Sequence, residues 1–378
     1  MNSSKKIFTL IILLLSVLMF SITIVTAVAV SESQNDMTKH DGIQIEVKYK
    51  KVSTNKIIFN GNRGKIGSKK TVSVNIKKGT KIGKFPTTPK RNGYIFMGWY
   101  TKKTGGTKIT KNTKPTKSVV YYAQWKDTPA NYENKLKSLI KDNSVSVEAK
   151  NELFRILKVQ LQNPEILYSL MKNKVKISIV PIGVYMTDLP EFKGLLGTST
   201  FDGRGWKYTR GVSYFKYGKN IYVGVCEENL IGKDPQVEHP QNTNQMQDGY
   251  TKGYSTTTHE IAHAIHYYAL SQKDQNIIKN CYAKTKRSGN WVDGPGKSYA
   301  SSDAREYFAQ LSNAYLGTNT GYDPFTNYPR HNGKEWIKNN DIEMYNLLKK
   351  IYKNGEVNTI YPDGRLKEGG VITNNYYK

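Results

Sequence analysis

The sequence is poor in cysteine and, over one long stretch, has no acidic residue. Cys226 and Cys281 are the only cysteines among 378 residues, which excludes a cysteine-based zinc ribbon and a dense disulfide framework. Between Lys51 and Lys126 there are 19 Lys and Arg but no Asp or Glu. Residues 127–378 contribute only +7 to a formal charge of +27. The positive charge is therefore concentrated in one small segment, and the change near residue 127 predicts a domain boundary.

Hydrophobic residues make up 38% of the chain and aromatic residues 11%. This content of core-forming side chains excludes a wholly disordered protein. After removal of a targeting segment, roughly 350 residues are enough for two or three domains.

The N-terminus has the pattern of a secretory signal. Lys5 and Lys6 precede an uncharged, mostly apolar run over residues 7–30, and Ala27-Val28-Ala29 has the small-x-small form of a cleavage site. We predict a signal peptide at residues 1–29; a membrane anchor is the alternative, since about 20 apolar residues span a bilayer. Both place the chain outside the cytoplasm, secreted or at the cell surface. We therefore expect no nucleic-acid partner and, after cleavage, no membrane partner. In an oxidising environment outside the cytoplasm the two cysteines can form a disulfide, but the sequence does not show whether they do.

Residues 53–126 read as a small β-rich module between linkers at 30–52 and 127–134. Short β-prone runs are separated by glycine turns, and the runs cover 56–60, 71–76, 94–100 and 118–125. The segments Phe59-Asn60-Gly61-Asn62, Gly93 to Tyr100 and Tyr121 to Trp125 resemble the Listeria–Bacteroides repeat of the internalin B-repeat type. The resemblance implies a β-grasp-like fold found on bacterial surface and secreted proteins.

The charge of this module has two interpretations. The absence of acids favours electrostatic binding to an anionic wall or cell-surface polymer, which salt would screen. The alternative is a spacer whose lysines only keep it soluble.

Residues 135–378 predict an α+β domain, rich in helices with a small sheet. Apolar residues recur at helical spacing over 147–161, 255–270, 303–316 and 341–352, and Asn163-Pro164-Glu165 has the features of a helix start. The β-branched runs 175–182 and 220–226 predict strands. Residues 194–218 predict loops around an irregular hairpin.

The sequence His259-Glu260-Ile261-Ala262-His263 contains residue types that bind metal ions and accept protons. On a helix, the spacing of four residues places both imidazoles on one face within reach of a single zinc ion. Glu260 is then directed at water beside the metal, as a general base, and is not a ligand. The apolar neighbours predict a buried helix, in which histidines need partners that a metal ion supplies.

The spacing within this motif does not identify the third ligand. A metzincin would need a histidine at position 269, which is alanine. His266 lies two turns from His259, too far to share one tetrahedral ion, so we expect it behind the ligands or facing solvent. A carboxylate from a later helix remains. Glu306, in an apolar helix, and Glu343 are the candidates. The other loop histidines and one further acid are expected to have no metal role: His239, His331 and Glu335.

A second resemblance chooses between the carboxylates. The segments His259 to Ile265 and Lys297 to Gln310 resemble the anthrax lethal factor-type catalytic domain, a family that includes secreted Pro-Pro endopeptidases. It implies a compact gluzincin-type zinc peptidase fold, with Glu306 as third ligand and Tyr299, seven residues earlier, as the group that stabilises the oxyanion.

Together these patterns predict a secreted zinc metalloendopeptidase with one catalytic Zn²⁺ and a basic module for surface or wall association. The zinc ligands are expected to be His259, His263 and Glu306. The substrate is expected to be a protein, bound as an extended strand near 212–214 or 220–226. The alternative is a non-catalytic adhesin or wall-binding protein in which zinc is structural.

Overall fold

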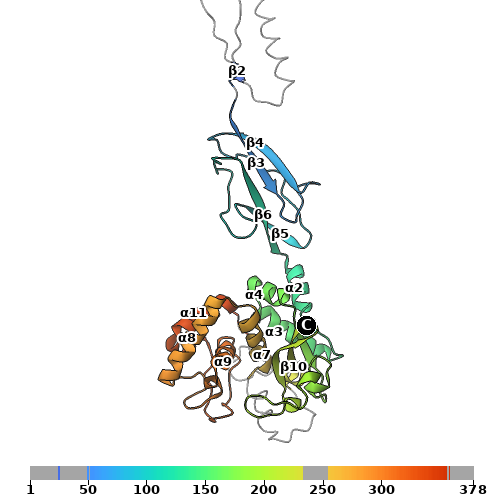
Figure 1. The fold of residues 1–378 in the computed structure, drawn as a ribbon, viewed down its shortest axis with the longest axis vertical. Helices are drawn as coiled ribbons and strands as arrows, with labels where there is room; N and C mark the ends of the chain where they lie inside the picture. Colours follow the sequence, from blue (N-terminus) through green and yellow to red (C-terminus); the bar gives the residue numbers. More distant parts are fainter. Residues whose placement is uncertain (1–23, 26–48, 51, 233–253, 356, 358–378) are drawn as a thin grey trace, which may run out of the picture. The chain divides into compact units, whose positions relative to one another are not determined.

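The protein is described by a computed structural model over residues 24–25, 49–50, 52–232, 254–355 and 357 (Figure 1). Its contacts divide the chain after Asn131. The predicted signal peptide lies outside the described residues, except for β1 (Ile24–Val25), which pairs antiparallel with β2 (Tyr49–Lys50). Among the described residues, no helix is both long and apolar enough to cross a membrane.

The first unit contains a four-stranded sheet in the order β4-β3-β6-β5. The central pair, β3 and β6, is parallel, and both outer pairings are antiparallel. Its core includes Phe59, Trp99 and Tyr121, which are almost fully buried. All four strands fall on the four runs predicted from alternation: β3 (Thr54–Asn60), β4 (Thr71–Lys77), β5 (Tyr94–Tyr100) and β6 (Val119–Asp127).

A tryptophan closes the turn after β3. The Trp125 indole N–H donates to the carbonyls of Gly61 and Asn62. A Cβ at Gly64 would lie 2.3 Å from the Trp125 ring, a separation that no packed side chain tolerates. Glycine at this position therefore reflects close packing of the ring on the turn backbone.

The second unit has a mixed sheet in the order β7-β8-β10-β9. β7 (Ile140–Lys141), β8 (Val175–Val180) and β10 (Asn220–Cys226) run parallel, and β9 (Gly211–Tyr217) is antiparallel to β10. The strand at 220–226 is therefore interior, with a neighbour on each side. The prediction that it offers an edge to a substrate strand is wrong, and of the two candidate segments only β9 lies at an edge of the sheet.

Helices supply most of the core of this unit, and they pack partly on the sheet and partly on one another. The predicted helices are present, and Ser146 and Asn163 cap the first two by accepting a backbone N–H. The sequence reading did not identify α8, a 17-residue helix whose exposed face is rich in lysine. The helices are α2 (Pro129–Lys137), α3 (Val147–Gln160), α4 (Pro164–Lys172), α5 (Glu227–Ile231), α7 (Thr256–Tyr268), α8 (Gln272–Ser288), α9 (Ala304–Tyr315), α10 (Lys334–Asn340) and α11 (Ile342–Tyr352), with 3₁₀ turns η1 (Met186–Asp188), η2 (Lys193–Leu195), η3 (Trp206–Tyr208) and η4 (Tyr299–Ser301).

The fold is thus mixed α/β, as predicted in outline. Cys226, at the end of β10, and Cys281, in α8, are both buried and not joined in a disulfide. Helices α7 and α9 pack against each other, and α7 also lies against β9 and β10. This three-way contact positions the residues described next.

Candidate metal centre

Two capped helices present three potential ligands. Ser255 caps α7 by accepting the Thr258 N–H, and the helix then carries His259 and His263 on the face toward α9. Asp303 caps α9 by accepting two backbone N–H groups, one of them from Glu306. Because each cap fixes the first turn of its helix, the side chains start from defined positions.

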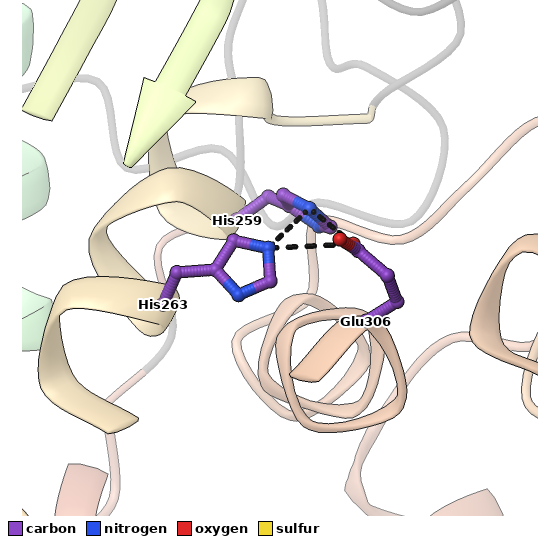
Figure 2. Close-up of side chains that lie close together, drawn as sticks. All are labelled: His259, His263 and Glu306. Atoms are coloured by element: carbon purple, nitrogen blue, oxygen red, sulfur yellow. Dashed lines mark hydrogen bonds and ion pairs between the residues drawn. The ribbon is translucent and has the colours of Figure 1, made fainter. Parts of the chain in front are cut away.

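The three side chains converge on one point (Figure 2). The Nε2 atoms of His259 and His263 lie 3.1 Å apart. Glu306 Oε2 is 3.1 Å from the first Nε2 and 3.3 Å from the second. All three residues are buried, so water does not separate them from one another.

This geometry fits a tetrahedral zinc ion. Bonds of about 2.0–2.1 Å in a tetrahedron place neighbouring ligand atoms about 3.3 Å apart, close to the three separations observed. Burial alone would raise the pKa of Glu306, but the two facing imidazoles hold that pKa far below its ordinary range. The carboxylate is therefore charged, and three buried donor atoms at these separations are placed to share one metal ion. Within the described part of the chain, no other group of this kind is found.

Glu260 is adjacent in sequence but stands outside the ligand group. The Ser213 hydroxyl of β9 donates to its carboxylate and also to its backbone carbonyl. A Cβ at Gly211 would lie 2.6 Å from Glu260 Oε1. Strand β9 thus provides both a hydrogen-bond donor and the space that the carboxylate occupies.

Tyr299 lies in η4, just before α9. Its ring centroid is 5.9 Å from that of His259. Burial and the charge of Glu306 raise the pKa of the Tyr299 phenol well above its ordinary value, so the hydroxyl keeps its proton and remains a donor. The guanidinium of Arg204 interacts with the same phenol.

The remaining candidates are separated from this group. His266 is buried, with its ring 5.1 Å from that of Phe308, so the solvent-facing alternative is wrong. His331 stacks on Trp336. Glu343 and Glu335 are exposed on α11 and α10, and His239 lies outside the described residues.

Sequence reasoning missed Gly211 and Ser213. They lie almost fifty residues before the helix they serve, and no local spacing connects them to Glu260. The signal available was the expectation of a strand near 212–214 that pairs with substrate, and it did not indicate a contact with Glu260.

Comparisons with known proteins support one of the two resemblances. Residues 56–124 match the family model of the Listeria-Bacteroides repeat domain, which confirms the predicted repeat. No curated protein matches the chain. Among solved structures, the Pro-Pro endopeptidase of Paenibacillus alvei matches with a TM-score of 0.39 and 21% identity, over 58% of this chain and 100% of its own. A likeness of this strength transfers no activity, so the functional argument rests on the site itself.

The ligand assignment predicts that two glutamates behave differently. Glu306→Ala removes one of three ligands, so we expect zinc affinity to fall by at least the 10–100-fold typical of losing an outer hydrogen-bond partner. Glu343→Ala is the matched control, because this exposed side chain is on another helix. Bound zinc per chain, measured by metal analysis after dialysis, tests both. Loss of zinc from the control with retention in Glu306→Ala would reverse the assignment.

The contacts of Glu260 predict a second pair of effects. Ser213→Ala removes the donor, and Gly211→Ala forces the carboxylate aside. We expect both to retain zinc. If the site is that of the peptidase that the sequence predicts, turnover should fall roughly tenfold or more in the first variant and further in the second. Gly205→Ala is the control, because its Cβ would meet its nearest neighbour at 3.4 Å, an ordinary contact. Unchanged turnover in Gly211→Ala would show that Glu260 does not need this position.

Proposed function

We propose that the protein is a secreted zinc endopeptidase of the gluzincin type, whose repeat associates it with an anionic cell surface. The observation that carries the catalytic part is the division of labour between neighbours on α7. His259 and His263 converge with Glu306, while Glu260 is held separately by Ser213. A site with three protein ligands and a neighbouring carboxylate that is not a ligand is typical of catalytic zinc. A structural zinc ion is instead bound by four protein ligands.

His259, His263 and Glu306 would hold the ion. Zinc supplies Lewis acidity, which lowers the pKa of water and polarises a carbonyl. Glu260 accepts a proton from the attacking water, whose oxygen bonds to the peptide carbonyl carbon. The same carboxyl then protonates the departing amine nitrogen as the peptide C–N bond breaks.

Tyr299 acts on the charge that this addition creates. As the carbonyl oxygen becomes negative, the protonated phenol donates a hydrogen bond to it. Arg204, beside the phenol, adds positive charge on the same side. An extended substrate would pair along the edge strand β9, in the manner of an added strand, which also brings it past Glu260.

The non-catalytic alternative accounts for less. A structural zinc site needs no residue comparable to Glu260, and no empty space at Gly211 to accommodate its carboxylate. Digestion of a peptide library with and without a zinc chelator distinguishes the two functions. We expect cleavage that stops when the metal is removed and returns when zinc is added.

The two catalytic roles predict variants that bind zinc but lose most of their peptidase activity. Glu260→Gln preserves shape but cannot accept a proton, so turnover should fall by about 10²–10⁴-fold. Tyr299→Phe removes only the phenolic hydroxyl, so kcat should fall by roughly 10²–10³-fold. Tyr352→Phe, which removes another buried phenol elsewhere, serves as the control. Zinc content and kcat are measured for each. A zinc-free Glu260→Gln would make Glu260 a ligand.

The repeat presents its charge to solvent. Every described lysine in residues 53–126 is exposed, and the first acid after the segment, Asp127, is buried. Arg91 is the exception among the cations, since it is partly covered and lies 3.5 Å over the ring of Tyr94. An accessible cationic surface with no acids to offset it suits a polyanionic polymer of a cell wall or cell surface.

The repeat therefore predicts salt-sensitive attachment. Residues 53–126 should bind purified wall polymer at low salt and release it at 1 M salt, where the screening length is about 3 Å. A co-sedimentation series over salt concentration measures this. Binding that persists at 1 M salt would exclude an electrostatic role and favour the spacer interpretation.

A further inference from the structure

The ring nitrogen of His259 that faces away from the metal centre belongs to a buried hydrogen-bond chain. His259 Nδ1 is 3.0 Å from the hydroxyl of Tyr254, just before α7. That hydroxyl donates to Gln310 Oε1 on α9 at 2.9 Å. Gln310 Nε2 donates to Asp293 Oδ2, also at 2.9 Å.

The far end of the chain fixes its direction. Asp293 is fully buried and is surrounded by donors: its Oδ2 also accepts the Ala300 N–H, and its Oδ1 accepts from Asn319. Arg330 Nε lies 3.6 Å from Oδ1. Burial raises the pKa of Asp293, while Arg330 and the N–H donors on its two oxygens oppose that shift. With donors on both oxygens the group accepts hydrogen bonds, so Gln310 turns its NH₂ toward Asp293. Its carbonyl oxygen then faces Tyr254.

The donor and acceptor roles at Gln310 determine which nitrogen of the His259 ring carries the hydrogen. An amide oxygen only accepts, so the single hydroxyl hydrogen of Tyr254 goes to Gln310. The phenol has only lone pairs left for His259. The Nδ1 atom must therefore carry the hydrogen, which leaves the lone pair on Nε2, the atom directed at the metal centre.

Burial stabilises this arrangement. It raises the pKa of the Tyr254 phenol well above its ordinary value, so the hydroxyl does not lose the proton that the chain depends on. The guanidinium of Arg330 lies 4.3 Å over the Tyr254 ring, so Arg330 lies beside both Tyr254 and Asp293.

We propose that Asp293, Gln310 and Tyr254 are positioning residues that hold His259 in the one tautomer able to bind a metal ion through Nε2. The proposal rests on the metal site of the proposed function but not on peptidase activity. It makes Gln310, more than 40 residues from the histidine in sequence, a determinant of metal affinity.

Two substitutions and their combination test the chain. Tyr254→Phe removes the acceptor, so zinc affinity should fall by roughly 10–100-fold. Gln310→Met removes the acceptor of the tyrosine hydroxyl, which then donates to His259 Nδ1 and places the hydrogen on Nε2. We expect an equal or larger loss. In the double variant the wrong donor is gone, so Tyr254→Phe should recover part of the affinity lost in Gln310→Met.

The measurements are zinc affinity by chelator competition and the tautomer of His259 in the metal-free protein by long-range ¹H–¹⁵N correlation above pH 8. The chain requires Nδ1–H in the unmodified protein and a shift toward Nε2–H in Gln310→Met. Tyr352→Phe, a buried phenol bonded to Ser312, is the control and should change neither readout.

Three outcomes would overturn the proposal. These are the Nε2–H tautomer in the unmodified protein, simple addition of the two losses in the double variant, and an equal loss in the control. If Gln310→Met does not fold, Tyr254→Phe alone still decides, because unaltered zinc affinity and tautomer in that variant would exclude the chain. Absence of zinc binding in the unmodified protein would instead reject the proposed function.

Discussion

Two imidazoles and one carboxylate meet where α7 packs on α9, and the arrangement of the second unit serves this contact. Removing such groups from water is costly unless partners replace it. Ser255 and Asp303 cap the two helices, and Tyr254 and Gln310 bridge them from behind the ligands. The contact between α7 and α9 therefore combines apolar packing with a network of hydrogen bonds. The packing and the network together fix the relative position of the two helices.

Two consecutive residues of α7, His259 and Glu260, face different neighbours. Successive side chains on an α-helix point about 100° apart, so His259 faces α9 while Glu260 faces β9. The sheet supplies Glu260 with a hydroxyl and an open position at Gly211. In the proposed function, the same helix therefore carries the metal ligands on one side and the proton acceptor on the other.

The sequence predicts whatever depends on local spacing. The four strands of the repeat, the cap at Asn163, and a buried helix with histidines four residues apart all follow from short-range pattern. Contacts between distant segments do not. The interior position of β10, the burial of His266 against α9, and the chain through Gln310 arise only when elements pack. A lysine-rich helix such as α8 escaped detection because its apolar face is narrow.

The repeat and the second unit differ in the types of ionisable side chain that they contain. Residues 53–126 contain no aspartate, glutamate or histidine, the residue types whose charge ordinarily changes between about pH 3 and pH 8. This module therefore has no carboxylate or imidazole side chain that mild acidification would protonate. The protein's side of any attraction to a polyanion is accordingly indifferent to acidification of the surroundings, and ionic strength is left as the variable that controls it.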